Sequence, residues 1–133
     1  MKDKKIGGER SLPVFFLFRS DKPQKKFVML MPTYGHTHRF GATGYRDFTL
    51  MSSKSSKFYE PDKIKREKVR QRYIKRHLAE PKGVHTPSSM SDEILWKKPT
   101  LRGGIKNFEE KFKVKIVFKD TKLTDKMKKE IMG

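Results

Sequence analysis

Two short apolar runs near the N-terminus most constrain the fold of this chain. Val14–Phe18 and Phe27–Met31 each have the length of a β-strand, and the eight residues between them, RSDKPQKK, include serine, aspartate and proline, which favour turns. The pattern predicts a β-hairpin that begins near Pro13 and has a loop longer than two residues. We expect one or two further strands, at His36–Phe40 and at Phe48–Met51, on either side of glycines that turn the chain.

A strongly basic helix is predicted over residues 62–80. Pro61 and Asp62 favour a helix start, and Pro81 ends the helix at or before Glu80. Two faces carry apolar residues, one with Ile64, Ile74 and Leu78 and its neighbour with Val69, Tyr73 and His77. Glu67 is the one interior acid, so pairs within the helix cannot neutralise its charge. We therefore predict a partner-binding surface formed by eight cations: Lys63, Lys65, Arg66, Lys68, Arg70, Arg72, Lys75 and Arg76.

Helical patterns return over residues 92–112. Ser91 is a candidate N-cap for a short helix that contains Trp96 and ends at Pro99. Thr100 can cap a second helix with the clearest amphipathic stripe of the chain, made of Leu101, Ile105, Phe108 and Phe112. Two adjacent glycines, Gly103 and Gly104, interrupt that stripe and indicate either a kink or a close approach of another backbone.

The overall prediction is one α+β core domain over residues 13–119. It has a small antiparallel sheet, made of the hairpin, one or two further strands and a late strand at 113–119, together with two to three helices. KVKIVFK, at 113–119, alternates as a half-buried strand does. Residues 1–12 are predicted to be a flexible basic arm. Residues 120–133 form a basic C-terminal tail, either a second arm or a weak helix with Leu123, Met127 and Ile131 on one face.

Charge balance indicates which partners such a domain needs. Thirty-three Lys and Arg against fifteen Asp and Glu leave a formal net charge of +18, so self-repulsion opposes folding unless acidic partners relieve it. The chain has no cysteine, which suits a reducing compartment. Its N-terminus lacks the apolar run of a signal peptide, and no apolar stretch has the length of a membrane span.

Residue patterns for catalysis or metal binding are weak. His36 and His38 share one face of the predicted strand, but no third ligand is evident, and a zinc site wants three or four. Tyr45 and Asp47 near a turn have no spacing that supports acid–base catalysis. The chain has none of the common nucleophile, metalloprotease, P-loop or dinucleotide-binding patterns. We expect no enzyme activity, no cofactor, no metal and no small-molecule substrate.

Three ordered sequence elements resemble a family of small basic virion proteins of nucleocytoplasmic large DNA viruses. The resemblance covers roughly residues 38–113. The first element contains Phe40, Gly41, Ala42, Gly44, Tyr45, Asp47, Phe48 and Thr49. The second contains Tyr73, Ile74, Arg76 and His77, and the third contains Leu95, Trp96, Lys98, Pro99, Thr100 and Leu101. The chain departs from the family pattern at MSSKSSK, where the family tends to carry acidic residues or histidine.

The resemblance implies a minor capsid protein of a large icosahedral double-stranded DNA virus. Such a protein cements larger shell subunits, so its expected partners are the major capsid protein, further minor capsid proteins and the anionic inner membrane. The expected location is the virion, on the inner side of the capsid shell, after assembly in the infected host cell, in the cytoplasm. The alternative is a viral nucleic-acid-binding or DNA-packaging protein, although basic residues are spread through every segment of the chain instead of forming one stripe.

Overall fold

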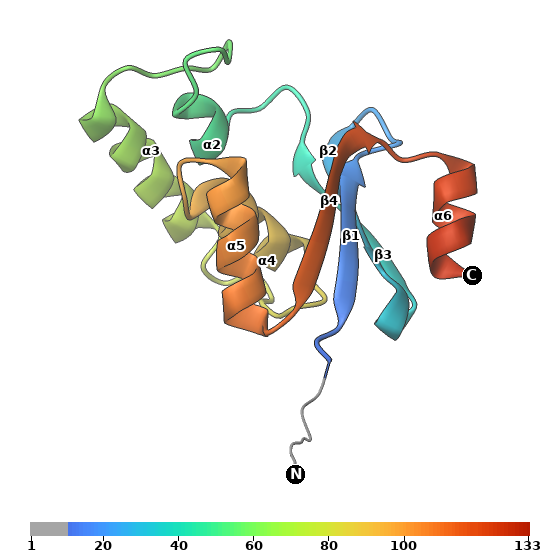
Figure 1. Ribbon diagram of the computed structural model, residues 1–133. Coiled ribbons are helices and arrows are strands. Elements are labelled where there is room, and N and C mark those ends of the chain that lie inside the picture. The colour runs from blue at the N-terminus through green and yellow to red at the C-terminus, as the bar shows by residue number, and fades with distance from the viewer. Residues whose placement is uncertain (1–10) are drawn as a thin grey trace.

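The computed structural model describes residues 11–133 and has the α+β architecture that the sequence predicts. Its strands are β1 (Val14–Arg19), β2 (Lys25–Met31), β3 (His36–Ala42) and β4 (Lys115–Lys122). Its α-helices are α2 (Phe48–Met51), α3 (Lys63–Arg76), α4 (Pro87–Met90), α5 (Leu101–Phe112) and α6 (Asp125–Met132). A 3-10 turn, η1 (Pro32–Tyr34), precedes β3, and a π-helix, η2 (Ser91–Trp96), continues α4 (Figure 1). The predicted arm at 1–12 lies outside the described residues, apart from its last two.

The four strands form one mixed sheet in the order β3-β2-β1-β4. β1 and β2 form the predicted hairpin, and β3 adds to β2 in antiparallel register. The antiparallel prediction is wrong for β4, which pairs with β1 in parallel. Between β3 and β4 the chain passes through the helices α2 to α5, and such a long crossover allows the new edge strand to run in the direction of β1.

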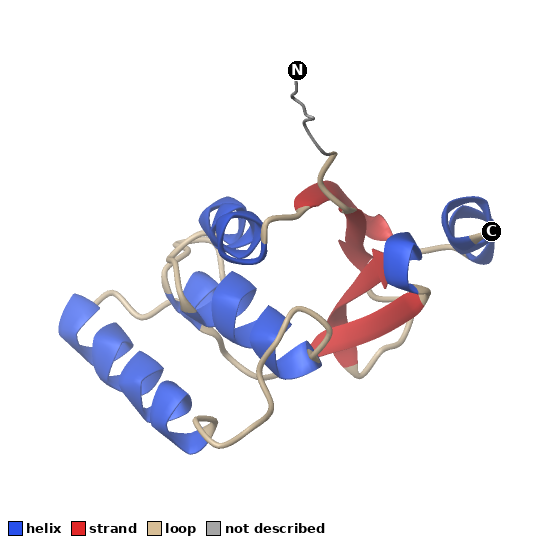
Figure 2. Ribbon diagram, turned by 90° about the horizontal axis from the view of Figure 1, so that it is seen from below, coloured by secondary structure: helices blue, strands red, loops and turns tan. Residues whose placement is uncertain are grey.

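The central strands are buried on both faces. On one face Phe15, Leu17 and Phe27 belong to a large core that includes residues of η2 and α5, while on the other Phe18, Val28 and Leu30 pack with residues of the C-terminal segment. Figures 1 and 2 show α6 on the opposite side of the sheet from the long helices. Burial on two faces explains why the first two strands read as continuous apolar runs instead of alternating ones.

The predicted basic C-terminal tail is a packed helix. Thr124 caps α6 by accepting a hydrogen bond from the Met127 amide, and Leu123, 3% exposed, anchors the chain just before it. Met127 and Ile131 then pack against the second face of the sheet. The prediction of a flexible arm at 120–133 is therefore wrong, whereas the predicted apolar face of Leu123, Met127 and Ile131 is present. This apolar face stabilises the fold because it covers the side of the sheet that no other described segment covers.

The predicted fourth strand at Phe48–Met51 is the short helix α2. Asp47 is its N-cap, and the carboxylate accepts hydrogen bonds from the Leu50 amide at 2.9 Å and from the Thr49 hydroxyl at 2.6 Å. An aspartate that satisfies free amides in this way favours a helix start. Four residues of apparent alternation could not distinguish this turn of helix from a strand.

The basic helix α3 is shorter than the predicted 62–80. Asp62 is the N-cap, as expected, with its carboxylate accepting from the amides of Ile64 and Lys65. The helix ends at Arg76, well before Pro81, and residues 77–79 form turns. The predicted helix over the Trp96 segment begins earlier than expected, at α4, and its second part has the wider π-type winding.

Gly104 marks a close backbone approach. A Cβ atom at this position would lie 1.9 Å from the carbonyl oxygen of Ile94, and α5 runs through both glycines without interruption. The close approach, not a kink, is therefore the correct alternative for the two glycines.

Near this contact, Asn107 and Lys111 donate hydrogen bonds to the Glu93 carboxylate. Burial would raise the pKa of Glu93, but these hydrogen bonds outweigh it and lower the pKa.

None of the helices described in residues 11–133 combines the length and the apolar character needed to cross a membrane.

Candidate binding cleft

An aromatic stack attaches the basic helix α3 to the rest of the fold. The ring of Tyr73 lies 4.1 Å from that of Trp96, centroid to centroid, at an interplanar angle of 5°. His77 packs against the same tyrosine at 4.2 Å. Arg70 donates a hydrogen bond through Nε to the Trp96 carbonyl oxygen at 2.7 Å. The second and third resemblance elements thus meet in space. Burial and the nearby Asp92 carboxylate raise the pKa of Tyr73, so its hydroxyl stays neutral.

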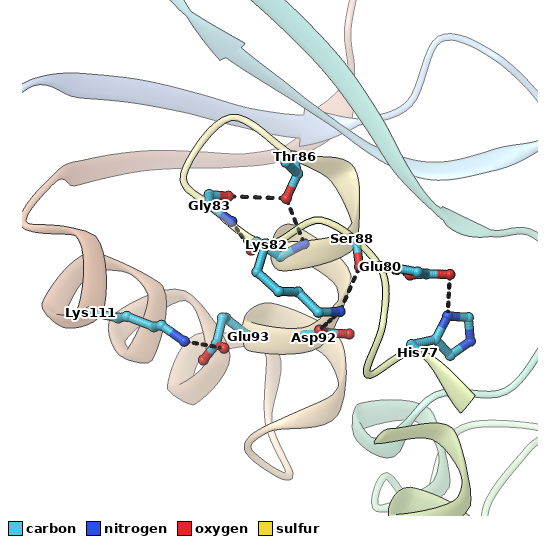
Figure 3. A network of polar contacts seen from close by, with 10 residues as sticks. His77, Glu80, Lys82, Gly83, Thr86, Ser88, Asp92, Glu93 and Lys111 are labelled. Carbon is cyan, nitrogen blue, oxygen red and sulfur yellow. Dashed lines mark hydrogen bonds and ion pairs between the residues drawn. The ribbon is translucent and has the colours of Figure 1, made fainter. Parts of the chain in front are cut away.

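A network of polar contacts fixes the linker that follows α3 (Figure 3). His77 Nδ1 and the Ser88 hydroxyl each lie 2.7 Å from an oxygen of the Glu80 carboxylate. Lys82 then bonds to Ser88 at 2.8 Å and to Asp92 at 2.5 Å. The Ser88 hydrogen bond, followed by that of His77, lowers the pKa of Glu80. These contacts hold the C-terminal end of α3 against α4 and η2, so the helix has a fixed orientation.

The eight predicted cations do not all face solvent. Arg66 turns inward and donates to the Glu60 carbonyl oxygen, and Arg70 supports Trp96 while it pairs with Glu67 at 2.9 Å. These two arginines stabilise the fold. The six exposed cations, which have no ion-pair partner among residues 11–133, are Lys63, Lys65, Lys68, Arg72, Lys75 and Arg76.

Five of the exposed cations lie along one flank of α3. At about 100° per residue, these side chains span roughly 100° of the helix circumference, and we name them the basic flank: Lys65, Lys68, Arg72, Lys75 and Arg76. The packing face is the one with Val69 and Tyr73. On the alternative apolar face, Ile64 is 70% and Leu78 72% exposed. The contacts of Arg70 and Tyr73 with Trp96 hold α3 against the fold, so the basic flank has a defined position.

Asp47 supports the loop that contains the first resemblance element. Asp47 is 2% exposed, and its carboxylate pairs with Lys26 Nζ at 2.8 Å, in addition to capping α2. Lys26 also donates to the Tyr45 carbonyl oxygen, and Gly44 has a φ of +85°, which favours glycine. Asp47 is therefore a structural residue, whereas the Tyr45 side chain is 71% exposed.

The resemblance elements converge on a cavity of about 520 Å³ between α3 and the adjoining ends of β2 and β3. Its lining contains ten residues of the resemblance elements: Phe40, Gly41, Ala42, Tyr45, Asp47, Tyr73, Arg76, His77, Leu95 and Trp96. It also contains the cations Lys25, Lys26, Arg46, Arg72 and Arg76. We name this cavity the basic cleft.

Eight residues of the resemblance elements, among them Gly44 and Pro99, lie outside the lining of the basic cleft. Gly44 shapes the turn beside it, and Pro99 lines a separate hollow next to the start of α5. Sequence reasoning missed Lys25, which begins β2, and Arg46, which lies in the loop after β3, because only the fold brings them opposite α3. In the sequence, Lys25 was visible only as part of the loop of the predicted hairpin, and Arg46 only as a neighbour of the glycine turn.

A cluster of histidines lies where β3 meets the linker after α3. His36 and His38 share a face of β3, as predicted, with ring centroids 5.4 Å apart, and His85 approaches His36 at 4.9 Å. His85 is the neighbour that the sequence did not reveal. In the described part of the chain, no set of three His, Cys, Asp or Glu residues is arranged to hold a metal ion.

Acid is expected to destabilise the fold through His38. Burial, followed by the charges of His36 and His85, lowers the pKa of His38 below its ordinary value of 6.5. The unfolded chain therefore binds this proton more readily, and the stability from neutral His38, complete above about pH 6.5, is lost as pH falls toward the lower folded pKa. Urea unfolding between pH 8 and pH 5 should show a smaller decrease in unfolding free energy for His38→Gln than for the unmodified chain. Equal pH slopes for the two proteins would contradict this assignment.

Comparison with known proteins finds no matching family model, no similar curated protein and no similar solved structure.

Proposed function

We propose that this chain is a minor structural protein of the virion of a large icosahedral double-stranded DNA virus. It cements larger shell subunits on the inner side of the capsid by binding their acidic faces. The observation that carries the proposal is the basic flank: five cations on one side of a docked helix, with no counter-ion among the described residues. The resemblance of residues 38–113 to virion proteins supports the same class.

Electrostatic complementarity explains why such a surface suits an assembly protein. A positive patch that meets a negative one accelerates association and excludes partners of like charge. The formal net charge of +18 favours dispersal of the free chain and is relieved when the chain docks. The partners proposed on this basis are the major capsid protein, other minor capsid proteins and the anionic inner membrane. Nucleic acid is the alternative partner, and the experiment below includes it as an outcome.

Location in the particle is the first test. Purified virions stripped stepwise should release the chain with shell proteins, as measured by mass spectrometry of each fraction. Release with the genome would instead favour the nucleic-acid alternative, and absence from mature virions would contradict the proposal.

Charge reversal of the basic flank is the second test. Lys65→Glu, Lys68→Glu and Lys75→Glu together should reduce incorporation into virions at least tenfold, because rim charges that attract the partner become repulsive. Arg70 is left unchanged, since it supports Trp96. The matched control reverses Lys122, Lys126 and Lys129, which are exposed residues near and on α6. Equal loss for both triple variants would remove the flank as the docking surface.

A further inference from the structure

We infer that the basic cleft binds an extended acidic segment of a partner chain. The inference rests on the proposed function and specifies the ligand of one site on the same surface. Two walls supply free cations: Lys25 and Arg46 come from the sheet side, while Arg72 and Arg76 come from α3. All four are exposed and form no ion pair with any residue from 11 to 133.

The two carboxylates that line the cleft, Asp47 and Glu80, offset only part of the charge of its five cations. Asp47 is already paired with Lys26 and caps α2. Glu80 is bonded to His77 and to Ser88. The free positive charge of the two walls therefore faces the cavity, where carboxylates of a ligand would form short charge-assisted hydrogen bonds with lysine and arginine.

The floor of the cleft favours a peptide with some apolar side chains. Phe40 and Leu95, each 1% exposed, lie at the base with Trp96, and Val69 adds a half-buried wall. The volume of about 520 Å³ falls within the range of pockets that enclose a ligand. A cavity of this volume admits part of an extended strand.

Aromatic geometry distinguishes a peptide from single-stranded nucleic acid. Proteins that bind single strands offer open aromatic faces on which bases stack. Here Tyr73 already lies between Trp96 and His77, so its ring faces are occupied. Of the aromatic residues that line the cleft, Tyr45 alone is exposed. The aromatic stack therefore supports the helix instead of providing a platform for bases.

The test is a titration with a defined peptide. The probe is a fluorescein-labelled 12-residue peptide of glutamates with two leucines, and the comparison probes are the same peptide with glutamine in place of glutamate and a 12-nucleotide oligothymidylate. Fluorescence polarisation should show binding of the acidic peptide that is tighter than binding of either comparison probe. Trp96 is the sole tryptophan and lines the cleft, so its emission, recorded with unlabelled peptide, should change on saturation.

Variants locate the binding. Arg46→Glu with Arg76→Glu, one from each wall, should raise the Kd of the acidic peptide at least tenfold. Lys126→Glu with Lys129→Glu makes the same change in net charge on α6, across the sheet, and should raise it less than threefold. Circular dichroism checks that all variants remain folded.

Several results would overturn the cleft assignment: equal losses in the two double variants, unchanged Trp96 emission, or tighter binding of the oligothymidylate. Arg72 and Arg76 belong to both surfaces, so the two proposals are separated by their measurements: peptide binding tests the cleft, and virion incorporation of the Lys65, Lys68 and Lys75 variant, which changes no cleft residue, tests the flank. If incorporation into virions depends on the flank but Arg46→Glu with Arg76→Glu leaves peptide binding unchanged, the cleft assignment is refuted and the proposed virion role stands. If the chain binds the peptide in the cleft but is absent from virions, the proposed virion role is refuted and the cleft assignment stands.

Discussion

Gly104→Ala is expected to lower the free energy of unfolding by about 3 kcal/mol, although alanine favours helices more than glycine does. The added Cβ would lie 1.9 Å from the Ile94 carbonyl oxygen and 2.9 Å from its Cα. Because these atoms belong to the backbone of η2, no side-chain rotation relieves the overlap, and α5 must move away from the core. Urea unfolding followed by circular dichroism measures the change.

Gly103→Ala is the matched control. Its Cβ would meet side-chain atoms of Thr100 and Lys98, at 2.9 Å and 3.3 Å, so small side-chain movements can accommodate it more readily. The control should change the unfolding free energy by no more than about 1 kcal/mol, the size of the helix-propensity difference. Similar effects of the two substitutions would show that the approach of α5 to η2 is not rigid.

Trp96→Ala is expected to cost about 3–5 kcal/mol, the usual range for removal of a large buried aromatic side chain. Trp96 is 7% exposed, and its ring stacks on the ring of Tyr73 in α3. Hydrogen exchange should therefore increase most in the amides of α3, because the helix has no fully buried residue of its own and depends on this stack. Denaturant titration measures the total loss of stability.

Tyr45→Ala is the control for an aromatic residue of the same cleft. Its side chain is 71% exposed, so the substitution should change stability by no more than about 0.5 kcal/mol. If exchange in α3 were unchanged by Trp96→Ala, the aromatic stack would not be what holds the helix, and the basic flank would need another support.

Local patterns were reliable where a segment carried its own signal. The hairpin at β1 and β2, the strand β3, the cap at Asp62 and the stripe of α5 all lie where the sequence predicts them. The four residues of α2 were misread because alternation over so short a run does not exclude a helical turn, and an aspartate cap decided the outcome.

The candidate site was predictable only in part. Eight cations on one helix were visible in the sequence, but Arg66 and Arg70 face the fold because Tyr73 and Val69, not Ile64, form the packing face. The helix had two apolar faces of similar strength, so periodicity could not choose between them. The stacking of Trp96 on Tyr73 determines which of the two faces packs against the rest of the fold.

The sequence by itself determined the α+β class, the central hairpin, the basic character of α3 and the excess of positive charge, because these depend on neighbouring residues and composition. Only the tertiary structure decided that β4 runs parallel to β1, that α6 covers the second face of the sheet, and that Lys25 and Arg46 lie opposite Arg72 and Arg76. These arrangements depend on contacts between segments distant in the chain, and such contacts leave no periodic mark in either segment.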